Sequence, residues 1–214
     1  MLVLKEGSLL KSIQWRLIIS ITVSLLLVLL TAFQWSIIDR TTPFLFLPLA
    51  GIIWFGFLIV FGLSLSCLTK LKTLGIKSGI PALIQVITLL AVIFIPFTTL
   101  WLKADFWIFK NQRDKVVQKV LSGELIPNVS HNSSLIALNS NYSNISMGGN
   151  EIVVEEHDGL KYIFFFTFRG ILDNYSGFLF VPDGGNPSNY SDLNEKDSTE
   201  LVHLDGNWYY ASHH

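Results

Sequence analysis

The first half of the chain contains three long runs of uncharged, mostly apolar residues. They cover residues 17–38, 44–68 and 80–102. A helix rises about 1.5 Å per residue, so each run is long enough to cross the roughly 30 Å hydrocarbon layer of a membrane. The first run exceeds the apolar core of a signal peptide, roughly 7 to 15 residues, and no small-x-small cleavage site follows it. We therefore predict three transmembrane helices after a short basic segment, residues 1–16.

The prolines and the spacing of apolar residues predict how the third helix continues. Pro96 lies inside the third run, where its missing N–H predicts a kink. Apolar residues recur at helical spacing over residues 103–122, and no Gly or Pro separates this stretch from residue 102. We expect one long helix that leaves the membrane and ends near Gly123, with Pro127 beyond it.

Alternating β-prone runs follow this helix. We predict strands over residues 151–156, 160–168, 177–181, 201–204 and 207–211. Asp158–Gly159 and Asp205–Gly206 separate two pairs of these runs, which predicts two hairpins. Residues 127–149 and 182–199 are rich in Asn, Ser, Gly, Asp and Pro, and we expect mostly loop there. Within the first of these segments, only residues 135–138 are apolar enough for a short strand. Strand 160–168 is apolar on both faces and should lie centrally, covered by the helix.

The predicted fold class is therefore a three-helix transmembrane region, residues 17–102, joined to a small extramembrane α+β domain, residues 103–214. The domain should hold one helix and an antiparallel sheet of four or five strands. Residues 1–123 hold 12 Lys or Arg against 4 Asp or Glu, whereas residues 124–214 hold 3 against 12. An acidic domain repels nucleic acid, so we do not expect a DNA- or RNA-binding role.

The membrane runs themselves lack the groups that ion conduction and cofactor binding need. They contain no Asp, Glu, Lys, Arg or His, and Gln34 and Gln85 are their only strongly polar residues. Proton relays, pumps and haem-bearing bundles normally use ionisable residues. This absence argues against a conduction pathway through one copy of the chain. Cys67, the single cysteine, lies in the second run and can form no intramolecular disulfide.

Small residues four apart mark possible helix-packing positions. Ser20 and Ser24 lie in the first run, and Gly62 and Ser66 in the second. This spacing lets neighbouring backbones approach closely, although ordinary membrane composition also produces it.

The distribution of basic residues predicts the orientation. Three spans place the N-terminal segment and the second loop on one side, with Lys5, Lys11, Arg16, Lys70, Lys72 and Lys77. The positive-inside rule makes that side cytoplasmic and the C-terminal domain extracytoplasmic. Five basic residues after the third span weaken the contrast: Lys103, Lys110, Arg113, Lys115 and Lys119. Long domains translocate largely regardless of charge, which still favours the outer placement.

The sequence offers few candidates for chemistry. It contains no Gly-rich phosphate loop, no Gly-x-Ser-x-Gly elbow and no His-Glu-x-x-His helix. His157 and His203 adjoin the predicted turns and could meet as a metal-binding or pH-sensitive pair, or simply be exposed. We assign no catalytic, cofactor or metal-binding residues. Asp183, Asn186, Asp192 and Asp197 fit no EF-hand spacing and are expected to form plain loop.

Two features of the acidic domain suggest an interaction surface. Arg169 could bind a ligand carboxylate or phosphate, or form an internal salt bridge. Trp208, Tyr209 and Tyr210 are three consecutive aromatics, and they cannot all face one small core. Some of them could contact a partner, the alternative being core packing.

One stretch carries a resemblance. Residues 164–184 read FFFTFRGILDNYSGFLFVPDG, and the chain continues later with NWYYAS. This part resembles bacterial, especially cyanobacterial, membrane proteins of unassigned function. The resemblance implies a bacterial source and an inner or thylakoid-type membrane, and it brings no activity or site residues with it.

Three functions remain open from the sequence. The first is a non-enzymatic, membrane-anchored protein whose acidic domain binds another membrane protein, or a second copy of itself, or scaffolds a complex. The second is an accessory subunit whose spans pack against a larger transporter or enzyme, with basic residues at the surface contacting anionic lipid. The third is a membrane-bound hydrolase or metal-dependent enzyme that would use Arg169, His157 and His203.

Overall fold

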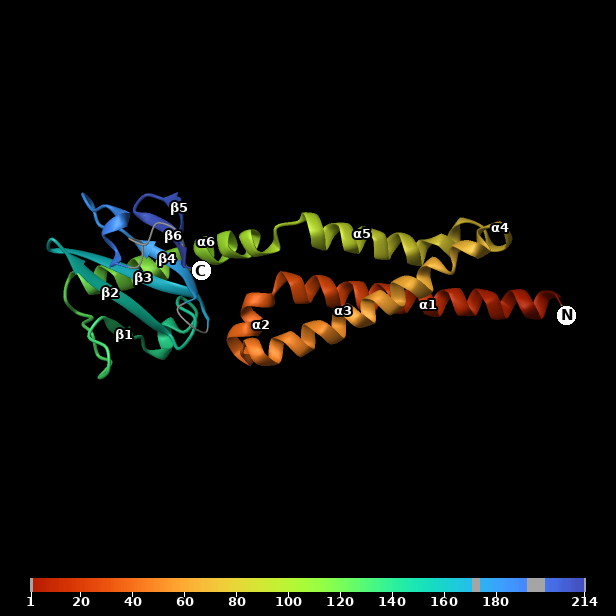
Figure 1. Ribbon diagram of the computed structural model, residues 1–214, viewed down its shortest axis with the longest axis horizontal. Coiled ribbons are helices and arrows are strands. Elements are labelled where there is room, and N and C mark those ends of the chain that lie inside the picture. Colours follow the sequence, from red (N-terminus) through yellow and green to blue (C-terminus); the bar gives the residue numbers. More distant parts are fainter. Residues whose placement is uncertain (1, 171–173, 192–198, 214) are drawn as a thin grey trace. The chain divides into compact units, whose positions relative to one another are not determined.

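A computed structural model of the chain describes residues 2–170, 174–191 and 199–213. The chain forms two compact units, residues 1–101 and residues 102–214. Figure 1 labels the helices and strands of both units.

Unit 1 is helical. It contains α1 (Leu2–Ala32), α2 (Gln34–Thr41), α3 (Pro43–Leu65), α4 (Leu71–Leu74) and α5 (Ile80–Phe94), with short 3₁₀ turns at Leu68–Lys70 and Ile76–Gly79. In Figure 1, α1, α3 and α5 run side by side, with α2 at one end of the bundle and α4 at the other. Pro43 and Pro81 lie in the first turns of α3 and α5, where a missing N–H costs nothing.

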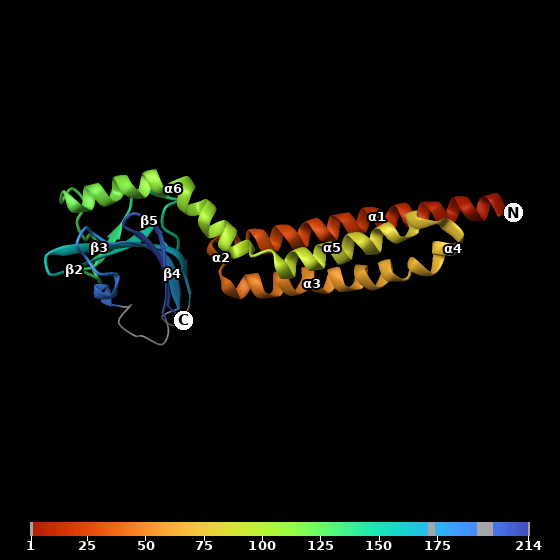
Figure 2. The ribbon, with the colours of Figure 1, turned by 90° about the horizontal axis from the view of Figure 1, so that it is seen from above.

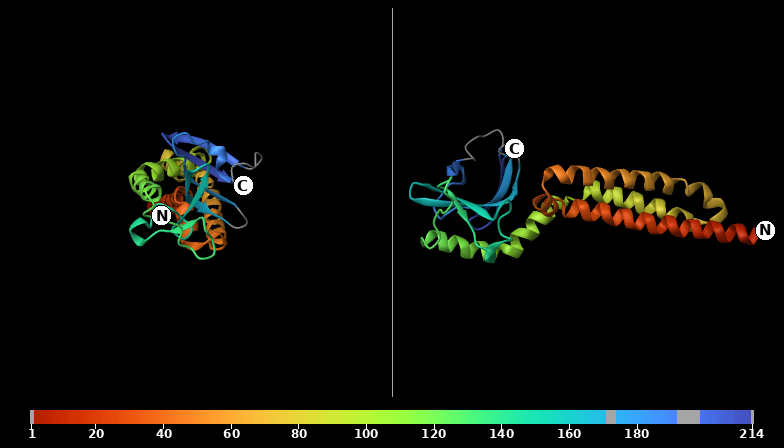
Figure 3. Two further views of the ribbon diagram at one scale, coloured as in Figure 1. Left: turned by 90° about the vertical axis from the view of Figure 1, so that its left-hand side faces the viewer. Right: turned by 90° about the horizontal axis from the view of Figure 1, so that it is seen from below.

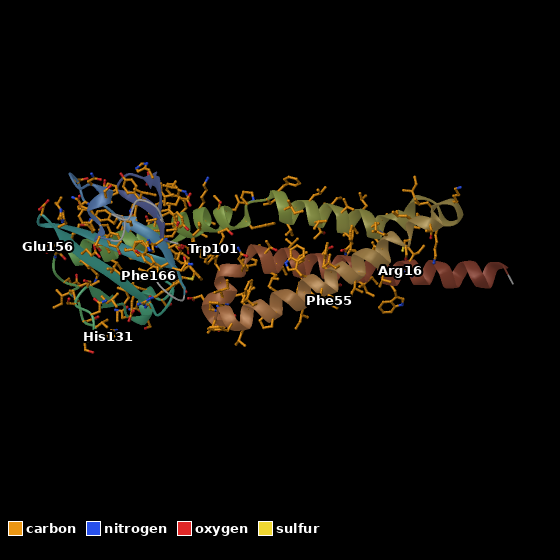
Figure 4. The ribbon with its side chains drawn as sticks, viewed as in Figure 1. Arg16, Phe55, Trp101, His131, Glu156 and Phe166 are labelled. Atoms are coloured by element: carbon orange, nitrogen blue, oxygen red, sulfur yellow. The ribbon has the colours of Figure 1, made fainter. Side chains whose placement is uncertain are left out.

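Three helical segments of unit 1 are long and apolar enough to span a membrane. They are Ile13–Ala32, Pro43–Lys70 and Ile76–Phe94. Their outward faces carry large apolar side chains that are exposed in the isolated chain, such as Ile18, Phe55 and Ile87. Phe55 on α3 is labelled in Figure 4. A soluble protein rarely exposes so much contiguous apolar surface, and a lipid environment removes the cost.

The prediction of one helix running from the third span to residue 122 was wrong at Pro96. Helix α5 ends at Phe94, Ile95 is extended with φ −84° and ψ 121°, and α6 (Phe97–Leu121) starts afresh. The residue before a proline avoids the helical region because the proline ring crowds its backbone. The proline therefore breaks the helix here instead of bending it.

The predicted end of α6 was correct. Gly123 has φ +78°, and its N–H donates to the carbonyl of Val120 at 3.2 Å. The N–H of Leu125 donates to the carbonyl of Lys119 at 3.0 Å. A left-handed residue followed by such a bond is a common helix terminus, and glycine adopts it without a steric penalty.

Unit 2 holds one antiparallel sheet in the order β1-β2-β3-β4-β6-β5. The strands are β1 (Leu135–Ala137), β2 (Glu151–His157), β3 (Leu160–Arg169), β4 (Tyr175–Phe180), β5 (Thr199–Asp205) and β6 (Trp208–His213). The predicted hairpins are both present, since β2 pairs with β3 and β5 pairs with β6. Asp158 and Gly159 have φ +54° and +77°, as a tight hairpin turn requires.

The predicted number of strands was too low. The sheet has six strands among the described residues, because the short apolar stretch at Leu135–Ala137 pairs with β2. The fourth strand also begins earlier than predicted, at Tyr175 instead of residue 177. The apolar stretch at residues 135–138 had suggested a short strand, whereas the start of β4 is set by its pairing with β3 and β6, which local composition does not reveal.

The sheet is buried on both faces. Helix α6 crosses one face, as Figures 2 and 3 show, and packs Phe106, Val116 and Val120 against Ile163 and Phe165. The central position of β3 and its cover by the helix confirm the prediction. The opposite face holds a second cluster around Tyr162, Phe164, Phe166 and Leu179.

The second cluster is covered in part by the segment after β4. Residues 182–191 were predicted as exposed loop, but Tyr190 is fully buried there and stacks on Phe164 with ring centroids 5.6 Å apart. The N–H of Asn186 donates to the hydroxyl of Tyr162 at 3.2 Å. A short 3₁₀ turn, Pro187–Asn189, precedes Tyr190. This part of the loop is therefore a packed cover for the sheet.

Candidate functional site

Unit 2 contains a cleft of about 570 Å³ at the β2–β3 hairpin. It lies beside the C-terminal end of α6, whereas the chain enters the unit at Leu102, about 27 Å away along the helix. Its walls come from stretches that are distant in sequence: the end of α6 with residues 125–127, residues 133–136, residues 154–161 and residues 189–191. The volume lies in the range typical of ligand-binding sites.

The floor of the cleft is apolar. Val120 and Ile136 are buried in the core between α6 and the sheet, and Val154 and Leu125 pack against that core. Ile126, at the rim, is 64% exposed. An apolar residue that sits exposed beside an apolar cleft can bury its side chain when a ligand binds.

Two charged residues of the cleft are held by hydrogen bonds to other segments of the chain. Lys161 donates from Nζ to the carbonyl of Val120 at 3.2 Å, near the end of α6, and this carbonyl also accepts from the N–H of Gly123. The carboxylate of Glu155 accepts from the N–H and the hydroxyl of Ser191 at 2.9 and 2.6 Å. These bonds fix the walls of the cleft.

The edge of β2 that faces away from β3 is open beside Glu155 and Lys161. Strand β1 pairs only with residues 151–153 of β2, and the N–H of Val154 then donates to the carbonyl of Ser134 at 2.7 Å. Backbone groups alternate between the two edges of a strand, so the N–H and C=O of Glu156 face the same edge as those of Val154. Among the described residues, no strand pairs with the edge at Glu156. Glu156 is labelled in Figure 4.

The cleft therefore combines apolar surface, an open strand edge and carboxylates. Glu156 and His157 are exposed at its rim, and His157 Nε2 lies 3.2 Å from the carboxylate of Asp158. Within the described residues, no group of three His, Cys, Asp or Glu side chains is placed to hold a metal ion. These features suit the binding of a partly apolar, extended ligand.

The structure separates the two histidines that sequence analysis considered as a pair. His157 ends β2, whereas His203 lies on β5, with β3, β4 and β6 between them. Neighbouring strands are about 4.8 Å apart, so the three intervening strands keep the two rings far from each other across the width of the sheet. His203 Nε2 lies 2.9 Å from the carbonyl of Gly206, and its ring contacts Tyr209. The hypothesis of a histidine pair was wrong.

Arg169 forms an internal salt bridge. Its Nη1 lies 2.7 Å from the carboxylate of Glu151, and its guanidinium stacks over the ring of Phe166. Of the loop residues weighed as calcium ligands, Asp183 accepts from Nδ2 of Asn207 at 2.8 Å. Asp192 and Asp197 lie outside the described residues.

The three consecutive aromatics are divided between the two faces of the sheet. Trp208 is buried beneath α6, where its Nε1 donates to Asp114 at 2.9 Å. Tyr210 packs against the same core, and Tyr209 packs against the opposite cluster. Burial raises the pKa of Tyr210 above its ordinary value. The three aromatics fit because each face of the sheet has its own core. The prediction had assumed a single core.

In unit 1, Ser20 and Ser24 lie between the helices. Ser20 Oγ is 3.0 Å from Oγ of Ser64 on α3, and both residues are buried. Gln85 on α5 donates from Nε2 to the carbonyl of Ser20 and to Oγ of Ser24, at 3.0 and 3.2 Å. These bonds tie α1 to both of its neighbours, as polar residues commonly do between membrane helices.

Gly62 and Ser66 lie elsewhere. Gly62 is exposed, and no other side chain lies within 4 Å of the position that a Cβ would take. Ser66 accepts from Nη1 of Arg16 at 2.8 Å, and the same nitrogen donates to the carbonyl of Leu63 at 2.9 Å. The buried small residue on α3 is Ser64, which the sequence pattern did not single out.

Comparison with known proteins gave no relative for either unit. No protein-family model, curated protein or solved structure matches the chain.

Proposed function

We propose that this chain is a membrane-anchored, non-catalytic binding protein whose cleft docks an extended segment of a partner protein. The observation that carries the proposal is the open edge of β2 inside an apolar cleft. An extended peptide that lies beside this edge would exchange two backbone hydrogen bonds with Glu156. Its alternate side chains would enter the space above Val120 and Ile136, as in other cases of strand addition.

The charges around the cleft favour a basic segment. Glu155 and Glu156 contribute two carboxylates, and Lys161 is directed to the carbonyl of Val120. Residues 124–214 carry 12 Asp or Glu against 3 Lys or Arg. This excess steers a cationic partner toward the unit, and a Lys or Arg beside Glu156 gives a specific contact. The occupant that fits is thus an extended peptide with alternating apolar residues and at least one basic residue.

The proposal assigns an anchoring role to unit 1. The lengths of its three apolar segments match the thickness of a bilayer, and their outward faces are apolar. We place the N-terminus and the loop that carries Lys70, Lys72 and Lys77 in the cytoplasm, and unit 2 on the outer side, by the positive-inside rule. The docking cleft would then act on extracytoplasmic partners.

A reporter fused after Ala211 tests the orientation. We expect alkaline phosphatase, which is active only outside the cytoplasm, to be active at this position, and a reporter that needs the cytoplasm to be inactive. The same pair of reporters fused after Gly75 should give the reverse result. Cytoplasmic activity at Ala211 would overturn the assigned orientation and leave the cleft unaffected.

Selection of peptides on the full-length protein tests the cleft. Random 12-residue peptides displayed on phage would be selected on the protein in lipid nanodiscs. We expect enriched sequences to alternate apolar residues with Lys or Arg. The double variant Ile126→Ser and Glu156→Lys should weaken the binding of a synthetic selected peptide at least about tenfold, since it removes apolar contact and reverses a charge. Fluorescence anisotropy measures the affinity.

A matched variant on the opposite edge provides the control. Val202→Ser with Glu200→Lys makes the same kinds of change at exposed residues of β5. It should leave the affinity unchanged. A selected peptide that is N-methylated at each backbone position in turn should lose binding at the position facing Glu156. Equal weakening by both double variants, or the absence of any enriched peptide, would refute docking in the cleft.

A further inference from the structure

The segment between the second and third apolar helices has an unusual composition. Residues 68–79, which we name the lysine loop, read LTKLKTLGIKSG and carry three lysines and no acidic residue. Within residues 1–104 the only acidic residues are Glu6 and Asp39. Asp39 belongs to α2, at the other end of α3, a helix of 23 residues or about 34 Å. The positive charge of the loop is therefore far from Asp39.

The lysine loop is folded against itself. Gly75, with φ +69°, separates two short helical pieces, and Ser78 donates from Oγ to the carbonyl of Gly75 at 2.9 Å. Side-chain methyls of Leu68 and Leu71 lie 3.7 and 3.4 Å from the position that a Cβ on Gly79 would take. The two ends of the loop are thus in contact, and the loop has a defined surface.

That surface mixes exposed apolar and basic side chains. Ile76, between Gly75 and Lys77, is 87% exposed, and Leu68 and Leu71 are about 40% exposed. Lys72 and Lys77 are exposed, and within the described side chains neither forms an ion pair. In water, exposing an isoleucine side chain at the tip of a loop costs free energy relative to burying it. At a membrane surface it lies in the acyl boundary while the neighbouring lysines reach the headgroups.

The part of α1 that lies beside the end of α3 also carries an exposed aromatic and a basic side chain. Trp15 is 60% exposed, and Arg16 reaches across to the end of α3, where its Nη1 donates to Leu63 and Ser66. Figure 4 shows Arg16 at the α4 end of the bundle. Exposed Trp beside Arg is typical of the membrane–water interface. The length of α3 also matches the hydrocarbon thickness, so the loop that follows it lies at a headgroup layer.

We propose that the lysine loop is an interfacial element that binds the phosphate headgroups of anionic phospholipids. Ile76, Leu68 and Leu71 insert into the boundary of the acyl chains, and Lys70, Lys72 and Lys77 contact lipid phosphates. Basic clusters next to a membrane helix attract anionic lipid in this way. The proposal rests on the membrane anchoring of the proposed function and is independent of the docking cleft.

Lipid retention by the full-length protein tests the loop. The protein would be reconstituted in vesicles with equal parts of phosphatidylglycerol and phosphatidylcholine, extracted with mild detergent, and its retained lipids quantified by mass spectrometry. The wild-type protein should retain phosphatidylglycerol in excess. The variant Lys70→Gln, Lys72→Gln, Lys77→Gln should lower that excess about tenfold or more, because each lysine contributes separately to the attraction. An excess of inorganic phosphate should displace none of the lipid.

A control variant removes the same charge elsewhere. Arg40→Gln, Lys103→Gln, Lys115→Gln changes three exposed basic residues outside the loop and should retain the wild-type preference. Equal loss in both variants, or displacement of the lipid by phosphate, would overturn the assignment. Alkaline extraction of the vesicles separates this failure from failure of the anchor. Wild-type protein that stays in the membrane without lipid preference refutes only the loop, whereas protein released by alkali refutes the anchoring itself.

Discussion

Replacing Arg113 by methionine should destabilise unit 2 by about 3–5 kcal/mol, because it leaves a buried carboxylate without its partner. Arg113 is 1% exposed, although it lies on α6 in a part of the sequence that is rich in exposed basic residues. Its Nη2 lies 2.5 Å from the carboxylate of Asp105, eight residues earlier on the same helix. Methionine keeps an unbranched apolar stem in the space that the stem of arginine occupies, so the loss is mainly electrostatic.

The guanidinium of Arg113 also contacts groups other than the carboxylate of Asp105. Its Nε donates to the carbonyl of Ile145 at 3.0 Å, and Nη1 donates to the carbonyl of Asp105 at 3.1 Å. The plane of the guanidinium lies over the ring of Phe178, 4.5 Å from the centroid. Arg113 thus connects α6, the segment before β2 and the sheet. Lysine cannot replace these directed bonds, since it has no planar set of donors.

The effect of Arg113→Met should depend on pH. Burial raises the pKa of Asp105 above its ordinary value of 3.8, and the charge of Arg113 opposes this rise. Without the arginine the folded-state pKa rises further. A raised folded-state pKa means that the folded unit holds its proton more firmly than the unfolded chain, so stability falls as pH rises through that pKa. The variant should therefore regain stability as the pH is lowered toward 4.

The measurement is protease resistance of the full-length protein in mild detergent as a function of urea. Cleavage within residues 102–214 reports unfolding of unit 2 while unit 1 remains in the detergent. The double variant Asp105→Leu with Arg113→Met removes both charges and should recover at least about half of the lost stability. A single variant as stable as the wild type, or a double variant less stable than the single one, would show that the ion pair does not hold the unit together.

The turns and the overall order of elements could be predicted from the sequence because their causes are local. Asp158–Gly159 forms a hairpin through the backbone preferences of two residues, and Gly123 ends α6 for the same kind of reason. Pro96 was recognised as a perturbation, but whether proline bends or breaks a helix depends on what surrounds it. Ile95 could leave the helical region here, and the helix broke.

Helix packing in unit 1 could be predicted only in part. Ser20 and Ser24 were singled out and are buried, yet on α3 the buried residues are Phe57 and Ser64 and not Gly62. The second apolar run is apolar all round, so the sequence holds no periodic signal for the face that meets α1. Ser64 is identified only by its distance to Ser20, 44 positions earlier.

The cleft could not be predicted because its walls are distant in sequence. Lys161 contacts Val120 across 41 positions, and Glu155 contacts Ser191 across 36. Each of these residues is ordinary in its own segment. The site arises where a helix end, a hairpin and a loop meet, which only the packing of the sheet determines.

Gly177→Ala should lower the stability of unit 2 about as much as the loss of a large core side chain does. A Cβ on Gly177 would lie 2.2 Å from the backbone oxygen of Phe165 and 2.5 Å from the ring of Phe164. Gly177 pairs with Phe166 on β3 and with Ala211 on β6, in the middle of the sheet. The backbone there is fixed by pairing on both sides and cannot move away. We expect a loss of about 3 kcal/mol, the upper end of the range for overpacking.

The aromatic cluster on the second face crowds this position as well, in addition to the backbone of Phe165. The ring of Phe164 is 5.2 Å from Phe166 and 5.5 Å from Tyr175, centroid to centroid, and Tyr190 stacks on it. A small residue beneath the ring lets it lie close to the sheet. The urea-dependent protease assay used for Arg113 measures the loss in Gly177→Ala.

Two further variants separate the backbone clash from other causes. Gly184→Ala meets no atom within 4 Å but has φ +80°, and it should cost about 1 kcal/mol from the left-handed backbone alone. Phe164→Leu combined with Gly177→Ala relieves the ring contact but leaves the oxygen of Phe165 in place. The double variant should therefore not recover stability. Recovery would show that the ring, and not the paired backbone, requires glycine at position 177.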